Sequence, residues 1–403
     1  MSEPVMTRRG FNQSICAAAL LLTACGGSSE AVTPLTPKPA TTQTSDPNAT
    51  ADAQAVQRYL AALTNGDIPG VMAGQNAGHG SQINDPSGLV GYAPLVEALG
   101  QSTGQLPAIV GIDYEHDLIF TPAQLAAANA TLAAHWQAGG LVTINWSPQN
   151  PWLNDESDLV ANQGVWTNTR TSGNNMANVK LGQLIDPTSA IFPVWRRKLD
   201  RIATALQDLQ QAGVVVLWRP MQEMNGNWFW WGSSTQPHTA TAYAALWQDM
   251  HRYFTQDKGL HNLLWVYSPT AAPTTADPAV REARWAYPGD AFVDVVAGTA
   301  YNDSLDLSDY LAYRSLGKPM GMGELGPQLG SSNSFNGQFD DTLYSRRLQS
   351  DFPAVAYWVS WHNYQADSTH VEHLSISSQR NAAALLQDVS TITLSRLGWK
   401  GYR

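Results

Sequence analysis

Two glutamates of this sequence stand where they could carry out acid–base chemistry on a sugar. Glu223 follows a buried apolar run at residues 214–218 and precedes four consecutive aromatic residues, 228–231. Aromatic faces stack on the apolar faces of pyranose rings, and a carboxylic acid can protonate a glycosidic oxygen. Glu324 lies between a short apolar segment and a glycine-flanked turn. The two residues therefore predict a site that cleaves a glycosidic bond.

The surroundings of the two glutamates suggest different roles. Aromatic neighbours disfavour the charged form of Glu223 and raise its pKa, which suits a general acid/base. Hydrogen bonds from Arg219 or Tyr301 would keep Glu324 ionised, which suits a nucleophile. The alternative interpretation is that the aromatic cluster is core, that Glu223 caps a turn and that Glu324 is a turn carboxylate.

Strand-like apolar segments alternate with helical segments along the chain, which predicts an α/β fold with a parallel sheet. Eight strand–helix units favour a (β/α)8 TIM barrel. The alternative, a doubly wound open sheet, would need a G-x-G-x-x-G loop after the first strand, and GQNAGHG at 74–80 lacks this spacing. The expected strands are 71–75, 108–113, 141–146, 214–218, 262–267, 292–299, 319–323 and 355–360. The expected helices are 53–64, 122–138, 191–211, 239–254, 305–316, one through Arg346, and 378–389.

The polar residues follow the ends of these strands, which is the catalytic face of such barrels. A long polar insertion at 152–188 is expected to form one wall of a substrate cleft. His79, His116 and His362 also lie at strand ends. We expect them to be surface or hydrogen-bonded residues, because their spacing marks no metal site, and we expect no metal and no cofactor.

Several segments resemble glycoside hydrolase family 26, the β-mannanase family. RPMQEMNGNWFWWG at 219–232 is similar to the family's acid/base signature, R-P-x-H-E-M-N-G-x-W-F-W-W. KPMGMGELG at 318–326 resembles its nucleophile strand, YPGDAFVDVVAGTAY at 287–301 its sixth strand, and SWHN at 360–363 its eighth. The resemblance covers most of residues 70–365.

The resemblance implies a retaining hydrolase with Glu223 as acid/base and Glu324 as nucleophile. Tyr301 would contact the nucleophile, and Trp228 and Trp361 would be sugar platforms. The full set of residues expected to bind substrate is Gln222, Arg219, Asn225, Trp228, Tyr301, Trp361, Trp146 and Ser147.

Two positions depart from the family pattern. Gln222 replaces the histidine before the acid, and Ser147 replaces the histidine after the tryptophan of the third strand. Both are expected to line the subsite where the bond breaks. An amide presents its donor and acceptor differently from an imidazole. We therefore expect weak activity on plain β-mannan, which Gln222→His, with or without Ser147→His, should raise.

Composition excludes several classes of partner. The chain of 403 residues has a formal net charge of -10, and 14% of its residues are charged. This acidic balance argues against nucleic acid and anionic membrane surfaces. Cys16 and Cys25 both lie in the first 25 residues, so no disulfide or cysteine-based metal site is expected in the folded part.

The N-terminus has the pattern of an export signal. Arg8, Arg9 and Phe11 resemble a twin-arginine signal, and the apolar run 15–22 is too short to span a bilayer. Leu-Thr-Ala-Cys at 22–25 resembles the lipobox of bacterial lipoproteins, with Cys25 lipidated; the alternative is an ordinary secretory signal. We expect a signal peptide at 1–25, a disordered linker at 26–52 rich in Pro, Ser and Thr, and a catalytic domain at 53–403.

The sequence therefore predicts an exported periplasmic or cell-surface lipoprotein. We expect a monomer that acts on a polysaccharide and touches the membrane only through its lipid. The expected activity is endo-β-1,4-mannanase-like. The alternatives are a hydrolase of another β-glycan or of the cell's own exopolysaccharide, and a non-catalytic glycan-binding lipoprotein.

Overall fold

The computed structural model describes residues 35–85, 87–115, 120–153, 164–165, 179–233, 239–271 and 277–403. The signal peptide with Cys25, His116 and most of the insertion 152–188 lie outside these ranges. The predictions made for them are therefore not addressed by the fold.

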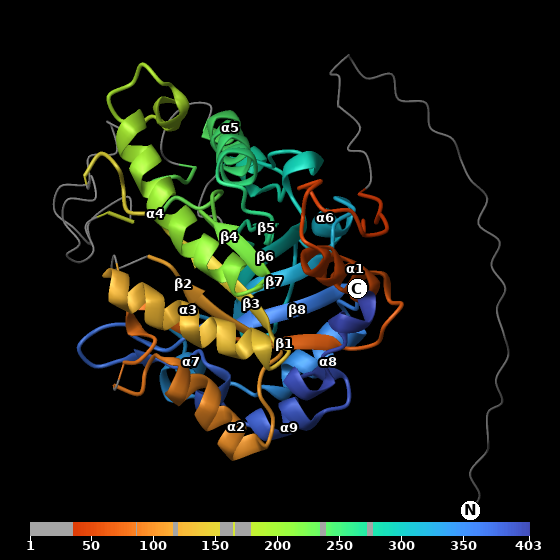
Figure 1. Cartoon of the computed structure of the whole chain (residues 1–403). Coiled ribbons are helices and arrows are strands. Elements are labelled where there is room, and N and C mark those ends of the chain that lie inside the picture. Colours follow the sequence, from red (N-terminus) through yellow and green to blue (C-terminus); the bar gives the residue numbers. More distant parts are fainter. Residues whose placement is uncertain are drawn as a thin grey trace, which may run out of the picture. The chain divides into compact units, whose positions relative to one another are not determined.

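Eight parallel strands form a closed barrel (Figure 1). Each strand pairs with the next, and β8 closes the barrel on β1, with Met72 opposite Tyr357 and Gln75 opposite Ser360. Every residue of β1 to β5, β7 and β8 is buried, as expected for strands covered by helices outside and by side chains inside. The predicted (β/α)8 barrel is confirmed. Its strands are β1 Val71–His79, β2 Ile109–Asp113, β3 Leu141–Trp146, β4 Val216–Pro220, β5 Leu263–Tyr267, β6 Val295–Tyr301, β7 Met320–Gly326 and β8 Val355–Ser360.

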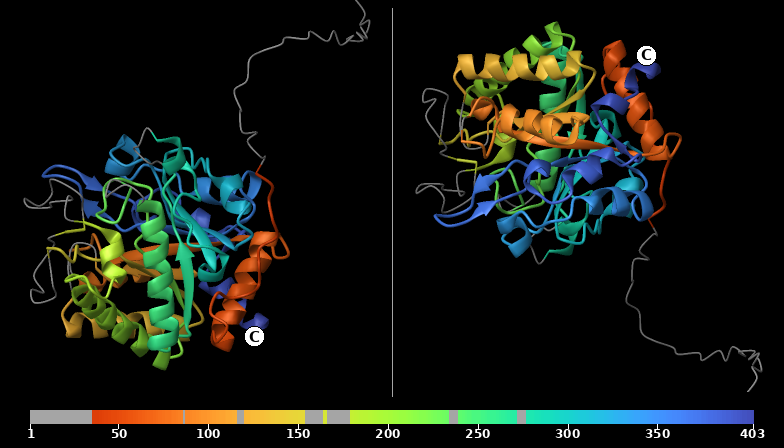
Figure 2. Two further views of the ribbon diagram at one scale, coloured as in Figure 1. Left: turned by 90° about the horizontal axis from the view of Figure 1, so that it is seen from above. Right: turned by 90° about the horizontal axis from the view of Figure 1, so that it is seen from below.

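Helices surround the barrel (Figure 2). The α3 helix shows which sequence signals made the helices predictable. The Thr121 side chain accepts from the backbone N–H of Gln124, the Gln124 side chain accepts from the backbone N–H of Thr121, and Pro122 occupies the first helical position. Two helices, α6 and α9, are shorter than the segments 305–316 and 378–389 that were expected to be helical. The helices are α1 Ala51–Asn65, α2 Ala98–Thr103, α3 Pro122–Gln137, α4 Phe192–Gln211, α5 Thr239–Arg252, α6 Tyr310–Arg314, α7 Ser332–Asn336, α8 Thr342–Ser350 and α9 Ala382–Gln387.

Three short strands were not expected from the sequence. β11 (Thr391–Ile392) pairs in parallel with the start of β1, where Val71 lies opposite Thr391. β9 (Tyr364–Gln365) and β10 (Val371–Glu372) form an antiparallel hairpin that follows β8. Two residues are too few to show the alternation that marks a strand. In both views of Figure 2 the hairpin projects from one end of the barrel, and α1 and the C-terminus lie toward the other.

The described part of the segment expected to be a linker packs on the barrel. Ser45 donates from its backbone and its hydroxyl to Asp294, the residue before β6, and Asp46 bonds His261 at 2.7 Å. Ala40 and Ala49 are buried. The expectation of an extended tether at 26–52 is therefore wrong for residues 40–50, because side-chain hydrogen bonds to the barrel hold a segment whose composition is typical of a linker. The remaining domain boundaries stay predictions.

None of the helices in the described ranges is long and apolar enough to span a membrane.

Candidate active site

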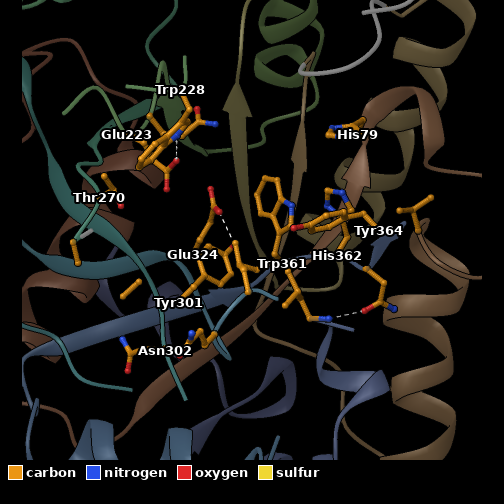
Figure 3. A pocket seen from close by; sticks show the side chains of 18 of the residues that line it. His79, Glu223, Trp228, Thr270, Tyr301, Asn302, Glu324, Trp361, His362 and Tyr364 are labelled. Carbon is orange, nitrogen blue, oxygen red and sulfur yellow. Dashed lines mark hydrogen bonds between the residues drawn. The ribbon is translucent and has the colours of Figure 1, made fainter. Parts of the chain in front are cut away.

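A cavity of about 1040 Å³ opens at the carboxyl ends of the barrel strands. The strands or the turns that follow them contribute His79 at the end of β1, Glu223 after β4, Tyr301 from β6, Glu324 from β7 and Trp361 after β8. Figure 3 shows both glutamates directed into the same space. The sequence prediction that the strand ends bring Glu223 and Glu324 together therefore agrees with the geometry.

A strained turn after β4 aims Glu223 into the cavity. Met221 and Glu223 have φ values of 50° and 56°, in the left-handed region that side-chain-bearing residues seldom adopt. The turn is held by the Glu223 N–H, which donates to the Ser268 carbonyl at 2.7 Å, and by the Gly226 N–H, which donates to the Glu223 carbonyl at 2.8 Å. Two strained residues held in this way are typical of a functional site.

The Glu223 carboxyl accepts two hydrogen bonds. Trp228 Nε1 donates to Oε2 at 2.7 Å, and the Thr299 hydroxyl donates to Oε1. Burial, and then the nearby charge of Glu324, raise the pKa of Glu223 to about 7. The donation from Thr299 and the positive charge of Arg219 oppose that rise. Glu223 is therefore a partly buried acid that holds its proton near neutral pH.

Glu324 has the opposite environment. Arg219 Nη2 donates to Oε1 at 2.8 Å, and the Tyr301 hydroxyl donates to Oε2 at 2.6 Å. Both donors stabilise negative charge and fix the direction of the two oxygens. Arg219 itself is buried and donates from Nε to the Ser268 hydroxyl at 2.8 Å. These are the two donors expected from the sequence, and they leave Glu324 as an oriented carboxylate at the cavity wall.

A glycine makes room for that arrangement. A Cβ on Gly323 would lie 2.5 Å from Arg219 Nε, well inside contact distance. The glycine before Glu324 is therefore needed for the close passage of the Arg219 side chain behind β7.

Only part of the aromatic cluster faces the cavity. Trp228 and Phe229 line it, as does Trp361. Trp230 and Trp231 are fully buried and donate from their indole N–H groups to the carbonyls of Pro148 and Gln222 at 2.6 and 2.8 Å. One side of the cluster therefore lines the cavity, and the other side is core.

Three residues expected to bind substrate have structural surroundings instead. Trp146 has no exposed surface and stacks on Trp195 and Trp218, with ring centroids 5.4 and 6.1 Å apart. Asn225 exchanges two 2.8 Å hydrogen bonds with the backbone of Thr270. Neither lines the cavity, because the side chain of each is used inside the protein. Arg219 likewise does not line the cavity and acts through Glu324.

Gln222 and Ser147, the two positions that depart from the family pattern, contact each other. Gln222 lines the cavity and donates from Nε2 to the Ser147 hydroxyl at 2.8 Å. Ser147 is fully buried and does not line the cavity, so it can reach a ligand only through Gln222.

Sequence reasoning missed several residues of the site. Thr299 bonds Glu223, and its position two residues before Tyr301 in one strand could have placed both on the same face. His79 and His362 were expected at strand ends as surface or hydrogen-bonded residues, and His362 Nδ1 donates to Asn76 Oδ1 at 2.9 Å. That both line the cavity, with ring centroids 4.9 Å apart, was not expected. Asn302 and Tyr364 also line it, without a pattern that would have marked them. Among the described residues, no group of three or more His, Cys, Asp or Glu side chains could hold a metal ion.

Comparisons with known proteins agree with this geometry. The model of glycosyl hydrolase family 26 matches residues 45–388. The chain is 30% identical over 89% of its length to mannan endo-1,4-beta-mannosidase A and B of Caldalkalibacillus mannanilyticus, of which it covers 67%. It is 29% identical to the mannan endo-1,4-beta-mannosidase of Bacillus subtilis, with 88% of this chain and 89% of that protein aligned. Among solved structures, the Bacillus subtilis mannanase BCman superposes with a TM-score of 0.70 at 27% identity, over 87% of this chain and 95% of that one.

Proposed function

Because the chain belongs to glycosyl hydrolase family 26, a family of retaining glycoside hydrolases, we propose that it is an endo-β-1,4-mannanase with Glu223 as acid/base and Glu324 as nucleophile. The observation that carries this proposal is the contrast between the two carboxyls of one cavity. Burial and Glu324 raise the pKa of Glu223 to about 7, whereas Arg219 and Tyr301 donate to Glu324. Environments that separate two carboxyls in this way assign the acid and the base.

In the first step Glu324 attacks the anomeric carbon while Glu223 gives its proton to the departing glycosidic oxygen. The C–O bond of the substrate breaks, and a glycosyl ester forms on Glu324. The indole N–H of Trp228 holds the Glu223 carboxyl in place for this transfer. The hydroxyl of Tyr301 orients the attacking carboxylate and keeps its second oxygen from rotating.

In the second step Glu223, now ionised, takes a proton from water, and the resulting hydroxide displaces Glu324 from the anomeric carbon. The product keeps the β configuration, and both carboxyls return to their starting states. The negative charge of Glu324 raises the pKa of Glu223 in the free enzyme, and this charge is lost in the glycosyl ester. The pKa of Glu223 should then fall, which suits its change from acid to base.

Mannan enters the proposal through the relatives, whose names specify β-1,4-mannan. The cavity supports an uncharged polysaccharide, because its lining among the described residues contains four acidic side chains, Asp85, Glu223, Asp306 and Glu324, and no lysine or arginine. An acidic cleft repels anionic sugars. This favours mannan or glucomannan over an acidic exopolysaccharide.

The experiment that tests the function is release of reducing ends from a panel of mannan, glucomannan, β-1,3-xylan, mixed-linkage glucan and self-produced exopolysaccharide. The account predicts the highest kcat/KM on mannan or glucomannan, and the departures at Gln222 and Ser147 predict that plain mannan is the poorer of these two. Gln222→His should raise activity on plain mannan. A protein that binds these glycans without releasing reducing ends would instead be a glycan-binding lipoprotein.

We also propose that the chain is exported and lipidated at Cys25. The support is the Leu-Thr-Ala-Cys pattern and the short apolar run that precedes it. Cys25→Ser should move the protein from the membrane fraction to the soluble fraction or leave it unprocessed. Identical soluble fractionation of the two forms would exclude the lipid anchor.

A further inference from the structure

The amide of Gln222 has an unusual environment for a residue that lines a sugar cleft. Its Nε2 donates to the Ser147 hydroxyl at 2.8 Å, whereas its Oε1 is buried and has no hydrogen-bond partner among the described residues. A buried acceptor without a partner is costly, so one at a ligand cavity points to a donor on the ligand. The orientation of this amide therefore decides what the cavity presents to the sugar.

That orientation is set by a chain of hydrogen bonds that begins at Asp113. Asp113 Oδ1 accepts the backbone N–H groups of Glu115 and Ser147 at 3.0 and 3.2 Å. Its Oδ2 accepts the Ser147 hydroxyl at 2.7 Å. A carboxylate only accepts, so the single hydroxyl proton of Ser147 is committed to Asp113.

The direction of the Ser147 hydroxyl in turn determines the orientation of the Gln222 amide. With its proton used, Ser147 Oγ can only accept, and only the NH₂ end of the amide can satisfy it. The carbonyl end must then face away from Ser147. The direction of every bond in the chain thus follows from the two backbone N–H groups and the hydroxyl that Asp113 accepts.

The three residues are arranged to keep this chain intact. They follow or end three adjacent strands, β2, β3 and β4, so the barrel itself fixes their spacing. Asp113 and Ser147 are completely buried, and Gln222 is 2% exposed. Hydrogen bonds in such a low-dielectric setting are strong, and solvent does not replace them.

We propose that Asp113 is a positioning residue that acts through Ser147 to hold the Gln222 carbonyl oxygen toward the bound sugar. The cavity at this point accepts a sugar group that donates a hydrogen bond and rejects one that only accepts. The inference deepens the proposed function and rests on it, because it takes the ligand to be a β-manno-oligosaccharide.

The test uses inhibition by β-mannotrioses in which each hydroxyl in turn is replaced by hydrogen or by fluorine. Fluorine accepts weakly and cannot donate, so it meets the Gln222 oxygen as a second acceptor. At one ring position the wild-type enzyme should bind the fluoro analogue about tenfold more weakly than the deoxy analogue, the scale of one hydrogen bond. Equilibrium inhibition constants keep the inductive effect of fluorine on the chemical step out of the comparison.

Asp113→Asn should invert that order. The two backbone N–H groups keep an oxygen at the Oδ1 position, so the new NH₂ group takes the place of Oδ2. It donates to Ser147, whose proton turns to Gln222, and the amide rotates to present its own NH₂ to the sugar. The fluoro analogue should then bind at least as well as the deoxy analogue. Ser147→Ala, which frees the amide, should bring the two analogues within about threefold of each other.

Asp294→Asn is the matched control. Asp294 is also buried and also accepts backbone N–H groups, from Ser45 and Trp265, but it lies before β6, at the opposite end of the barrel. It should alter thermal stability and leave the order of the analogues unchanged. An unchanged order in Asp113→Asn and Ser147→Ala, or no ring position at which fluorine is worse than hydrogen, overturns the proposal. If no mannotriose binds at all, the substrate of the proposed function is wrong, and the same scan is applied to the glycan that the panel identifies.

Discussion

At the scale of single residues, the chemistry depends on two carboxyls that differ in their donors. Glu223 accepts from an indole N–H and a hydroxyl and is partly buried, whereas Glu324 accepts from a guanidinium and a phenol. The same functional group thus has a raised pKa on one wall and two donors that orient it on the other.

The pH dependence of activity follows from the pKa of Glu223. The group is protonated below about 7 and ionised above it, so the acid needed for bond cleavage is lost as pH rises through that value. On natural polysaccharide, kcat/KM should fall about tenfold per pH unit on the alkaline side. Thr299→Val removes a hydrogen bond that lowers the pKa of Glu223. The alkaline fall in kcat/KM should therefore move to higher pH in this variant. If the alkaline fall in kcat/KM moves to lower pH in Thr299→Val, its assignment to Glu223 is contradicted.

The meeting of the two carboxyls in one cavity was predictable from the sequence, and the contacts of their neighbours only in part. Each glutamate ends a strand of a predicted barrel, which places both on one face. Whether a tryptophan next to such a strand end lines the cavity depends on packing, and Trp146 stacks between Trp195 and Trp218 in the core. Asn225 is held by the backbone of Thr270, which lies 45 residues further along the chain. No local sequence pattern predicts a contact between residues this far apart in the chain.

At the scale of elements, β4 and β7 carry the site and restrain each other. Arg219 from β4 passes behind Gly323 to reach Glu324 on β7. The strands themselves were predictable because they are continuous apolar runs, and β3 has the bounds that were expected. The β9–β10 hairpin and β11 were not, because each strand has two residues and depends on pairing with a partner.

Gly323→Ala tests the restraint between the two strands. The added methyl group would meet Arg219 Nε at 2.5 Å and displace the guanidinium from Glu324. A shift of about 1 Å in a catalytic group lowers the rate by about a hundredfold, and we expect a loss of kcat of that size with the fold retained. Gly401→Ala, where a Cβ has nothing within 4 Å, is the control and should keep wild-type kcat. Wild-type activity in Gly323→Ala would show that the Arg219 contact does not position Glu324.

At the scale of the whole molecule, residues 40–50 belong to the folded part. Composition alone suggested a linker to residue 52, but Ser45 and Asp46 bond barrel residues more than 200 positions away in the sequence. These residues lie at the end of the barrel opposite the cavity, since Asp294 precedes β6 and Tyr301 ends it.

Deletion of residues 1–47 tests the contribution of this segment to stability. It removes Ser45 and Asp46 and leaves the buried carboxyl of Asp294 with fewer donors, which costs about 1–3 kcal/mol per unsatisfied group. The melting temperature should fall, while kcat at room temperature should stay near wild type because the cavity is at the other end. Deletion of residues 1–34 is the control and should not change the melting temperature of the domain. Equal melting temperatures for the two deletions would show that the segment does not stabilise the barrel.

The central claim is that Glu324 is the nucleophile and Glu223 the acid/base, and the products formed with azide test it most directly. Glu324→Gly and Glu223→Ala are each incubated with an aryl β-mannobioside and sodium azide, and the glycosyl azide is identified by NMR. Without its nucleophile, Glu324→Gly should let azide attack the substrate itself and give the α-azide. Glu223→Ala should still form the glycosyl ester, because the aryl group needs little protonation, and azide should then give the β-azide. The account predicts these opposite configurations; the same azide anomer from both variants, or the reverse assignment, would contradict it.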